Sequence, residues 1–379
     1  MTRPQKHMRH RAPWALTAIA LAGSLCLAAC GTPQETTDTS AAEPTTTEQQ
    51  PTEQTQPAEQ PKQEEKKEEK KAAEPLWLTT KTEEHSESTY YLSEDKAPDS
   101  KVVQSTTVTR ENERGADGTL KKSTLTYEVE EKSEMMGAQK QVSESVTTWE
   151  CDKKGWPVSK KTSTTTTMSQ SFDGEEQSLD PEQTEIAENF TYERDKAGRV
   201  TKASSDNSES GTVDFSYDEA GNVAKTVHTY VLNENETYSN VVETITYDQQ
   251  GDPVTYKREA TAQDGGGSTT TEYKNVYKKD DKGHVLECTV EYGDGSKGTY
   301  TYERDAQGAA TSVVAVTSAT TDTTTYTNDE HGNPTASEQT SKDKNSNEEL
   351  GKKTTKAEYV ECKTPSEYQQ SLLAKNFGW

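Results

Sequence analysis

The sequence predicts an all-β protein: an extended or curved antiparallel β-sheet built from repeated hairpins, with a disordered N-terminal tether and one short C-terminal helix. Three observations predict this fold. An Asp-x-x-Gly turn motif recurs along the chain, apolar and polar residues alternate with a period of two between the turns, and only 28% of the 379 residues are hydrophobic. Because so few hydrophobic residues cannot fill the core of one thick domain, the composition favours a long, thin sheet.

The N-terminus resembles a bacterial lipoprotein signal. Four basic residues precede an apolar stretch from Trp14 to Leu27, which is followed by Ala-Ala-Cys30-Gly. We therefore expect a signal peptide over residues 1–29 and acylation of the Cys30 sulfur. An ordinary signal peptide that carries a cysteine near its cleavage site is the alternative. The expected location is extracytoplasmic, anchored by lipid to a bacterial cell membrane and exposed at the surface.

A polar segment follows the lipidation site. Residues 30–75 consist largely of Thr, Gln, Glu, Pro and Lys, with almost no aliphatic side chains. Such a segment cannot bury enough apolar surface to offset its chain entropy, so we predict a disordered linker. Its expected role is to hold a β-hairpin repeat domain, residues 76–363, away from the membrane.

The repeated turn is predicted to be structural. Asp at the first and Gly at the fourth position favour a type I turn, and Gly can also adopt positive φ in a bulge. We expect the Asp to bond nearby backbone N–H groups and the aromatic or apolar residue ahead of it to pack the sheet. The turn residues are Asp152 and Gly155, Asp195 and Gly198, Asp218 and Gly221, Asp248 and Gly251, Asp280 and Gly283, Asp305 and Gly308, and Asp329 and Gly332.

The repeated motifs resemble those of a known protein family. The segments Tyr192-Glu-Arg-Asp-Lys-Ala-Gly-Arg-Val200 and Tyr217-Asp-Glu-Ala-Gly-Asn-Val223 resemble the YD (RHS-type) repeats of bacterial cell-surface and toxin-delivery proteins. The resemblance covers roughly residues 149–340 and implies a continuous antiparallel β-strip at the cell surface. The chain has far fewer repeats than a toxin-enclosing shell and no separate toxin domain. The resemblance therefore implies a fold and a location, and it does not imply toxin encapsulation.

The pattern changes after the last predicted strand. Thr364-Pro-Ser-Glu367 reads as a capping box with Pro at the first helical position, and Tyr368, Leu372, Leu373 and Phe377 form an apolar stripe at helical spacing. The sequence predicts a helix over residues 364–379 that covers one end or one face of the sheet. A helix that binds a partner is the alternative.

Motifs for catalysis or metal binding are absent from the sequence. It has no His-x₃-His pair, no Gly-rich phosphate loop and no Gly-x-Ser-x-Gly elbow, so we expect no cofactor, no metal and no enzymatic activity. A formal net charge of −24 makes nucleic acid a poor partner. Cys151, Cys288 and Cys362 permit one disulfide or three thiols, and the sequence does not choose between them.

The expected function is therefore non-enzymatic. The leading hypothesis is an adhesion-type surface or binding protein with the membrane as partner through its anchor, and with an envelope glycan or a protein as ligand. Rows of tyrosines such as Tyr300 and Tyr302 can stack sugar rings, although the packing face of a sheet uses the same residues. The alternative hypothesis is a carrier of lipid or another apolar ligand, with a curved sheet closed by the C-terminal helix. An envelope enzyme is the third.

Overall fold

The computed structural model describes residues 76–93, 97–135, 137–172, 175–234, 237–263, 267–369 and 371. Apart from one 3₁₀ turn at Pro98–Ser100, the regular structure of this part is all strand. The strands are β1 (Leu76–Tyr91), β2 (Lys101–Arg114), β3 (Leu120–Ser133), β4 (Gly137–Cys151), β5 (Pro157–Phe172), β6 (Glu175–Ser178), β7 (Glu182–Arg194), β8 (Val200–Ser205), β9 (Thr212–Tyr217), β10 (Val223–Glu234), β11 (Thr237–Tyr247), β12 (Pro253–Ala262), β13 (Ser268–Lys279), β14 (Val285–Tyr292), β15 (Lys297–Arg304), β16 (Ala310–Val316), β17 (Thr320–Asn328), β18 (Pro334–Asp343) and β19 (Glu349–Cys362).

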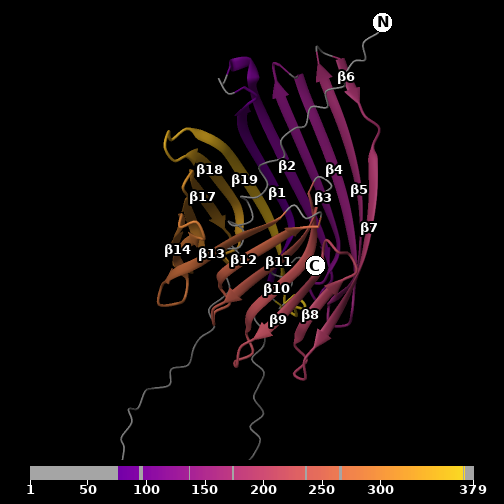
Figure 1. Cartoon of the computed structure of the whole chain (residues 1–379), viewed down its shortest axis with the longest axis vertical. Helices are drawn as coiled ribbons and strands as arrows, with labels where there is room; N and C mark the ends of the chain where they lie inside the picture. The colour runs from indigo at the N-terminus through magenta and orange to yellow at the C-terminus, as the bar shows by residue number, and fades with distance from the viewer. Residues whose placement is uncertain are drawn as a thin grey trace, which may run out of the picture.

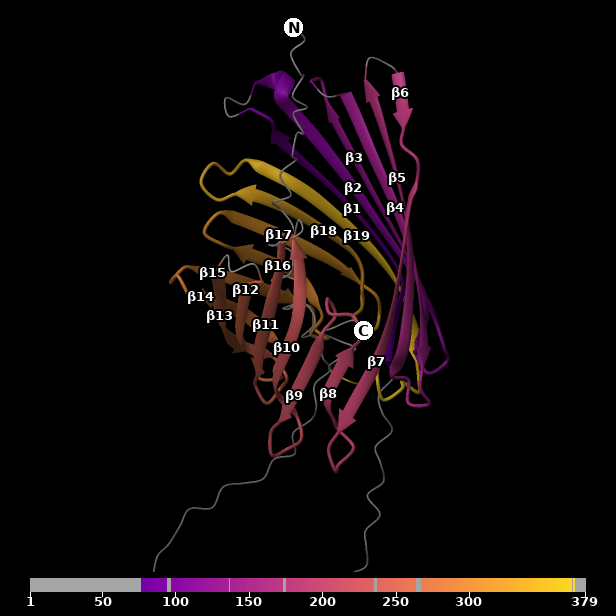
Figure 2. The same cartoon turned by 45° about the vertical axis from the view of Figure 1, so that its right-hand side comes forward.

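The sheet closes on itself as an antiparallel barrel (Figures 1 and 2). The first strand, β1, pairs with β2 on one side and with the last strand, β19, on the other, from Leu76 opposite Cys362 to Ser88 opposite Gly351. The short β6 lies end to end with β7 along β5, so the closed circle contains 18 strands. Closure pairs the two strands that would otherwise be open edges.

The predicted open or curved sheet is therefore wrong. Alternation and turn motifs identify strands from a few neighbouring residues, but the pairing of β1 with β19 joins residues 263 to 286 positions apart. The predicted C-terminal helix is wrong as well over the residues that are described. Residues 367–369 form a turn, and Tyr368 is buried instead of starting an apolar helical stripe. Gln370 and residues 372–379 of that prediction lie outside the described residues.

The Asp-x-x-Gly turns all lie at one end of the barrel. They connect β4 to β5, β7 to β8, β9 to β10, β11 to β12, β13 to β14, β15 to β16, and β17 to β18. Since successive antiparallel strands run in opposite directions, turns at every second connection share an end, together with the start of β1 and the end of β19. We call this end the turn rim and the opposite end the far rim.

These turns share one geometry. In each, the Gly N–H donates to the Asp carbonyl oxygen at 3.0–3.1 Å, and the Gly φ lies between 82° and 92°. The Asp Oδ1 accepts the backbone N–H four residues further on at 2.8–2.9 Å, as in Asp195 and Asp305. Gly is required because other side chains are strained at this φ.

The buried apolar side chains face the barrel interior in two groups. One contains Phe190, Val213 and Phe215 of β7 and β9 with Trp156 and Tyr368. The other contains Cys288, Val290, Tyr300 and Val313 of β14 to β16 with their neighbours. The cross-strand registers place both groups on the same face of the sheet.

Candidate functional site

The fourteen turn residues predicted from the sequence are not brought together as a ligand site. They are spread around the turn rim, one pair to each hairpin. Each Asp carboxylate bonds the backbone of its own turn, for example Asp152 to the N–H groups of Lys154 and Trp156 at 2.8 and 2.9 Å. Among the residues that the structure describes, no three His, Cys, Asp or Glu side chains are grouped as metal ligands would be.

A polar network does form on the inward face of β10 to β12. The Tyr230 and Tyr256 hydroxyls both donate to Oε1 of Glu243, at 3.0 and 2.9 Å. Arg258 lies directly opposite Glu243 across β11 and β12, with its Nε 3.6 Å from the same Oε1. Side chains from β10, β11 and β12 therefore meet at the Glu243 carboxylate, and these contacts hold the four side chains in fixed positions on the wall.

Aromatic rings continue this network around the wall. The register aligns Ile245, Tyr256, Tyr273 and Tyr292 in one row across β11 to β14. The rings of Tyr256 and Tyr273 stack with centroids 4.8 Å apart, and Tyr273 meets Tyr292 edge to face at 6.2 Å. These contacts restrict the rotamers of the row, so the wall is rigid on its inward side.

The surroundings set the ionisation of the network. Burial, followed by the charge of Glu243, raises the pKa of Tyr256 and of Tyr230. Burial acts to lower the pKa of Arg258, but a hydrogen bond with Tyr230 and the charges nearby outweigh it, so the net shift is upward. Both hydroxyls thus stay protonated as donors, and the guanidinium stays charged.

A cavity of about 280 Å³ lies between this network and the far rim. Its lining includes Leu232, Ser239, Arg258, Ala260, Ala262 and Thr269. The register explains why these residues line the cavity. Leu232, Ser239 and Ala262 form the inward row nearest the far rim. Ala260 belongs to the next row, and Arg258 to the row after that. A larger hollow of about 400 Å³ at the far rim of β2 to β4 is lined by residues such as Lys101, Val103 and Lys132. The residues described around this hollow form no comparable network.

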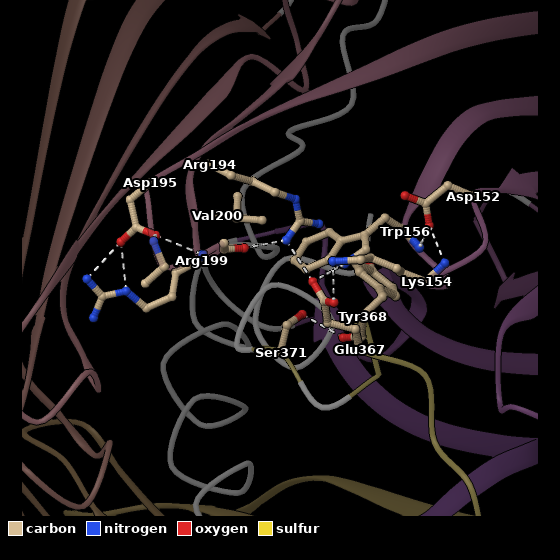
Figure 3. A network of polar contacts seen from close by, with 12 residues as sticks. Asp152, Lys154, Trp156, Arg194, Asp195, Arg199, Val200, Glu367, Tyr368 and Ser371 are labelled. Carbon is tan, nitrogen blue, oxygen red and sulfur yellow. Dashed lines mark hydrogen bonds and ion pairs between the residues drawn. The ribbon is translucent and has the colours of Figure 1, made fainter.

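Residues 364–369, which we call the C-terminal segment, are bound to the turn rim (Figure 3). Arg194 Nη1 and Trp156 Nε1 donate to Glu367 Oε1 at 2.7 and 3.1 Å, and Lys154 Nζ lies 3.0 Å from Oε2. Tyr368 is 5% exposed and packs edge to face on Trp156 at 5.3 Å. Burial acts to raise the pKa of Glu367, but these three donors outweigh it and hold the pKa below its ordinary value.

Glycines make room for this segment. A Cβ at Gly155 would collide with the Ser366 side chain. At Gly118 a Cβ would instead overlap Leu78 Cδ1 of β1 at 2.6 Å, while Gln369 Cγ, at 3.5 Å, is in ordinary contact. Ser366 also donates its backbone N–H to the Asp117 carbonyl at 2.9 Å. The segment therefore fits closely against the turns that precede β3 and β5.

The three cysteines are not bridged to one another. Cys288 is fully buried in the group on β14 to β16, and Cys362 is buried where β19 meets the turn rim. Cys151 is half-buried, and burial raises its pKa. In this structure the thiols act as small packing groups.

Sequence reasoning missed Glu243, Arg258, Tyr230 and the cavity beside them. A partial signal exists, since Glu243 shares its strand parity with Val241 and Ile245, and Arg258 shares its parity with Tyr256 and Ala260. Tyr230 has no such consistent signal, because Val227 and Val231 of its strand have the opposite parity. Parity does not reveal which residues lie opposite one another, because the loops at the far rim vary in length and register follows from the pairing. Glu243 and Arg258 could be matched only after β11 and β12 had been aligned.

Comparison with known proteins identifies no family. No protein-family model and no curated protein matches the chain. Among solved structures, a porin-like protein from Bacteroides uniformis is 13% identical with a TM-score of 0.30, covering 74% of this chain and 96% of its own. OprB from Pseudomonas putida is 10% identical with a TM-score of 0.28, covering 74% and 92%. These TM-scores are too low to assign a family or a function.

The resemblance to YD (RHS-type) repeats is wrong. Those repeats imply a continuous strip, whereas this chain forms a closed 18-stranded barrel in which the repeated turns only connect neighbouring strands. The Tyr-x-x-Asp-x-x-Gly pattern therefore reflects the requirements of a tight hairpin turn, and such turns occur both in YD repeats and in this barrel.

The fold also corrects the predicted location. Closed antiparallel barrels of this size are an architecture of integral outer-membrane proteins, and the barrel gives no support to a surface-exposed repeat strip anchored by lipid at Cys30. Cys30, the signal peptide 1–29 and the linker 30–75 lie outside the described residues. Over the described part of the chain, no helix is long and apolar enough to cross a membrane.

Proposed function

We propose that the protein is a non-enzymatic binding protein that holds a small ligand inside its barrel, on the wall formed by β10 to β13. The observation that carries this proposal is the juxtaposition of the network of Glu243, Arg258 and the two tyrosines with the 280 Å³ cavity. A concave site with apolar walls and a few fixed polar groups is the usual form of a small-molecule site.

The closed wall supports binding because it preorganises the site. The strands under the cavity are joined by continuous registers, from Leu232 opposite Ser239 through Ala260 opposite Thr269. A ligand there meets side chains whose positions are already set, which lowers the entropy cost of binding. The C-terminal segment occupies part of the turn rim, so the far rim, beside which the cavity lies, is the proposed entrance.

The outward face supports binding over conduction. It carries Lys–Glu pairs on many strands, including Lys140 with Glu128 at 2.7 Å near the far rim and Lys257 with Glu259 at 2.9 Å in the middle of β12. Barrels that cross a bilayer present an apolar outward band, and a Lys or Arg at its midplane costs about 2–4 kcal/mol. These pairs favour an outward face in water, and therefore a binding barrel.

A membrane pore is the second candidate, and the closed circle of 18 strands favours it. Barrels of about 16–18 strands leave room for an aqueous channel. Planar-bilayer recording with the full chain separates the two functions. Stepwise conductance that the purified protein adds to the bilayer would support the pore and contradict the binding barrel; its absence, with ligand binding in solution, supports the binding barrel.

The direct test is calorimetric titration of the full chain with a library of small organic acids, alcohols, amides and sugars. We expect at least one class to bind, and to raise the melting temperature when present in large excess over its Kd. The change Tyr256→Phe removes one of the two hydroxyls on Glu243 and should weaken that binding. If no class binds, or if Tyr256→Phe leaves binding unchanged, the site on β10 to β13 is not the binding site.

A further inference from the structure

We propose that the cavity takes a small carboxylate ligand with an apolar body, and that Arg258 binds the carboxylate. This inference rests on the proposed binding function and names the ligand class of the same site. It follows from the hydrogen-bond capacity of Arg258, the engagement of Glu243, and the side chains between Arg258 and the far rim.

Arg258 has donors to offer. A guanidinium carries five N–H groups in a planar fork that matches a carboxylate. The contact of its Nε with Glu243 is 3.6 Å, longer than a hydrogen bond, and a bond with Tyr230 uses one donor. Arg258 also lines the cavity, with 26% of its side chain exposed. Most of its donor capacity therefore remains for a group that enters the cavity.

Glu243 does not prevent a second carboxylate from binding. Its Oε1 accepts hydrogen bonds from Tyr230 and Tyr256 at 3.0 and 2.9 Å, which stabilise its negative charge. Its main partners are thus the two hydroxyls, and Arg258 is the cation nearest to it. A ligand carboxylate would accept hydrogen bonds from the N–H groups of Arg258, which Glu243 approaches only to 3.6 Å.

The rest of the lining sets the body of the ligand. Leu232, Ala260 and Ala262 present apolar carbon between Arg258 and the far rim, while Ser239 and Thr269 add two hydroxyls. A cavity of about 280 Å³ is just below the usual range for ligand sites, which begins at about 300 Å³. A short aliphatic or aromatic acid meets both requirements, with its charge on Arg258 and its carbon chain along the alanines.

The test uses hexanoate as the probe and hexanamide as its neutral match, titrated into the full chain by calorimetry. We expect hexanoate to bind at least tenfold more tightly than hexanamide. The change Arg258→Gln should abolish that preference, and Arg258→Lys should retain part of it, because Lys keeps the charge without the fork. Arg110→Gln is the matched control and should have no effect on binding. Arg110 is an exposed arginine on β2, which lies half-way around the closed circle of strands from β12.

The outcomes separate the inference from the proposed function. Equal affinity for hexanoate and hexanamide, or hexanoate binding that Arg258→Gln leaves unchanged, would overturn the carboxylate assignment. The binding barrel itself would stand if another class still bound and Tyr256→Phe weakened it. If no probe of any class bound, both would be wrong. Far-UV circular dichroism and melting of each variant establish that a loss of binding is not a loss of fold.

Discussion

Two turn glycines with the same backbone conformation and different surroundings provide a quantitative test of the turn rim. Gly251 and Gly308 have φ of 85° and 92°. A Cβ at Gly251 would meet nothing within 4 Å, whereas a Cβ at Gly308 would lie 2.5 Å from His284 Cε1 and Nε2. The change Gly251→Ala therefore isolates the backbone strain, and Gly308→Ala adds a steric overlap to it.

The expected costs follow from these two terms. Left-handed backbone costs a non-glycine residue about 1–2 kcal/mol, which is the whole effect expected for Gly251→Ala. Overpacking adds about 1–3 kcal/mol at Gly308. Moving the His284 ring away would break the contact of its Nδ1 with Asp280 Oδ2 at 2.9 Å. Gly308→Ala should therefore destabilise the barrel by about 2–5 kcal/mol.

Equilibrium urea unfolding of the full chain measures both changes, with His284→Ala as the third variant. Removing the ring should recover most of the extra cost, so the double variant His284→Ala/Gly308→Ala should show a coupling energy of about 1–3 kcal/mol. Equal costs for Gly251→Ala and Gly308→Ala, or a coupling energy near zero, would refute the contact between neighbouring hairpins at the turn rim.

Three further predictions concern the rim and the thiols. Tyr368→Ala should cost about 3 kcal/mol of the attachment of the C-terminal segment, because the ring is 5% exposed, and faster amide exchange of residues 366–369 should report it; unchanged exchange would contradict the packing on Trp156. Since its folded pKa is lowered from 4.5, Glu367 should stabilise this attachment above that pH and lose its contribution as the pH falls through the lower folded value. The contribution is about 1 kcal/mol, because the carboxylate is 41% exposed, and Glu367→Gln should remove the pH dependence of the amide protection factors in the segment, which are exchange rates corrected for the intrinsic effect of pH. Iodoacetamide should modify Cys151 before Cys288, slowly at neutral pH because burial raises the pKa of Cys151, and early modification of Cys288 by mass spectrometry would contradict its burial.

Local information in the sequence was enough for the strands and their turns. Segments such as Val213-Asp-Phe215 alternate because one side of the strand is buried and the other is not, and the structure has β9 there. The Asp and Gly of each motif occupy a turn because the residues that satisfy the Asp carboxylate are two to four positions away. Such contacts depend on sequence spacing alone.

The C-terminal segment shows where local rules failed. Thr364-Pro-Ser-Glu367 has the composition of a capping box, but Glu367 accepts from Arg194, Trp156 and Lys154, which belong to distant hairpins. Helix propensity contributes a few tenths of a kcal/mol per residue, which is less than burial of Tyr368 and three charge-assisted contacts. Tertiary packing therefore overrode the local preference.

The sequence by itself determined an all-β chain of hairpins with a polar exterior, because those properties follow from period, turn chemistry and composition. Only the tertiary structure decided that the sheet closes, since closure depends on β1 meeting β19 and on the sum of many small twists and registers. It also decided the candidate site. Glu243 and Arg258 lie on different strands, and only their register across β11 and β12 places the guanidinium beside both a carboxylate and a cavity.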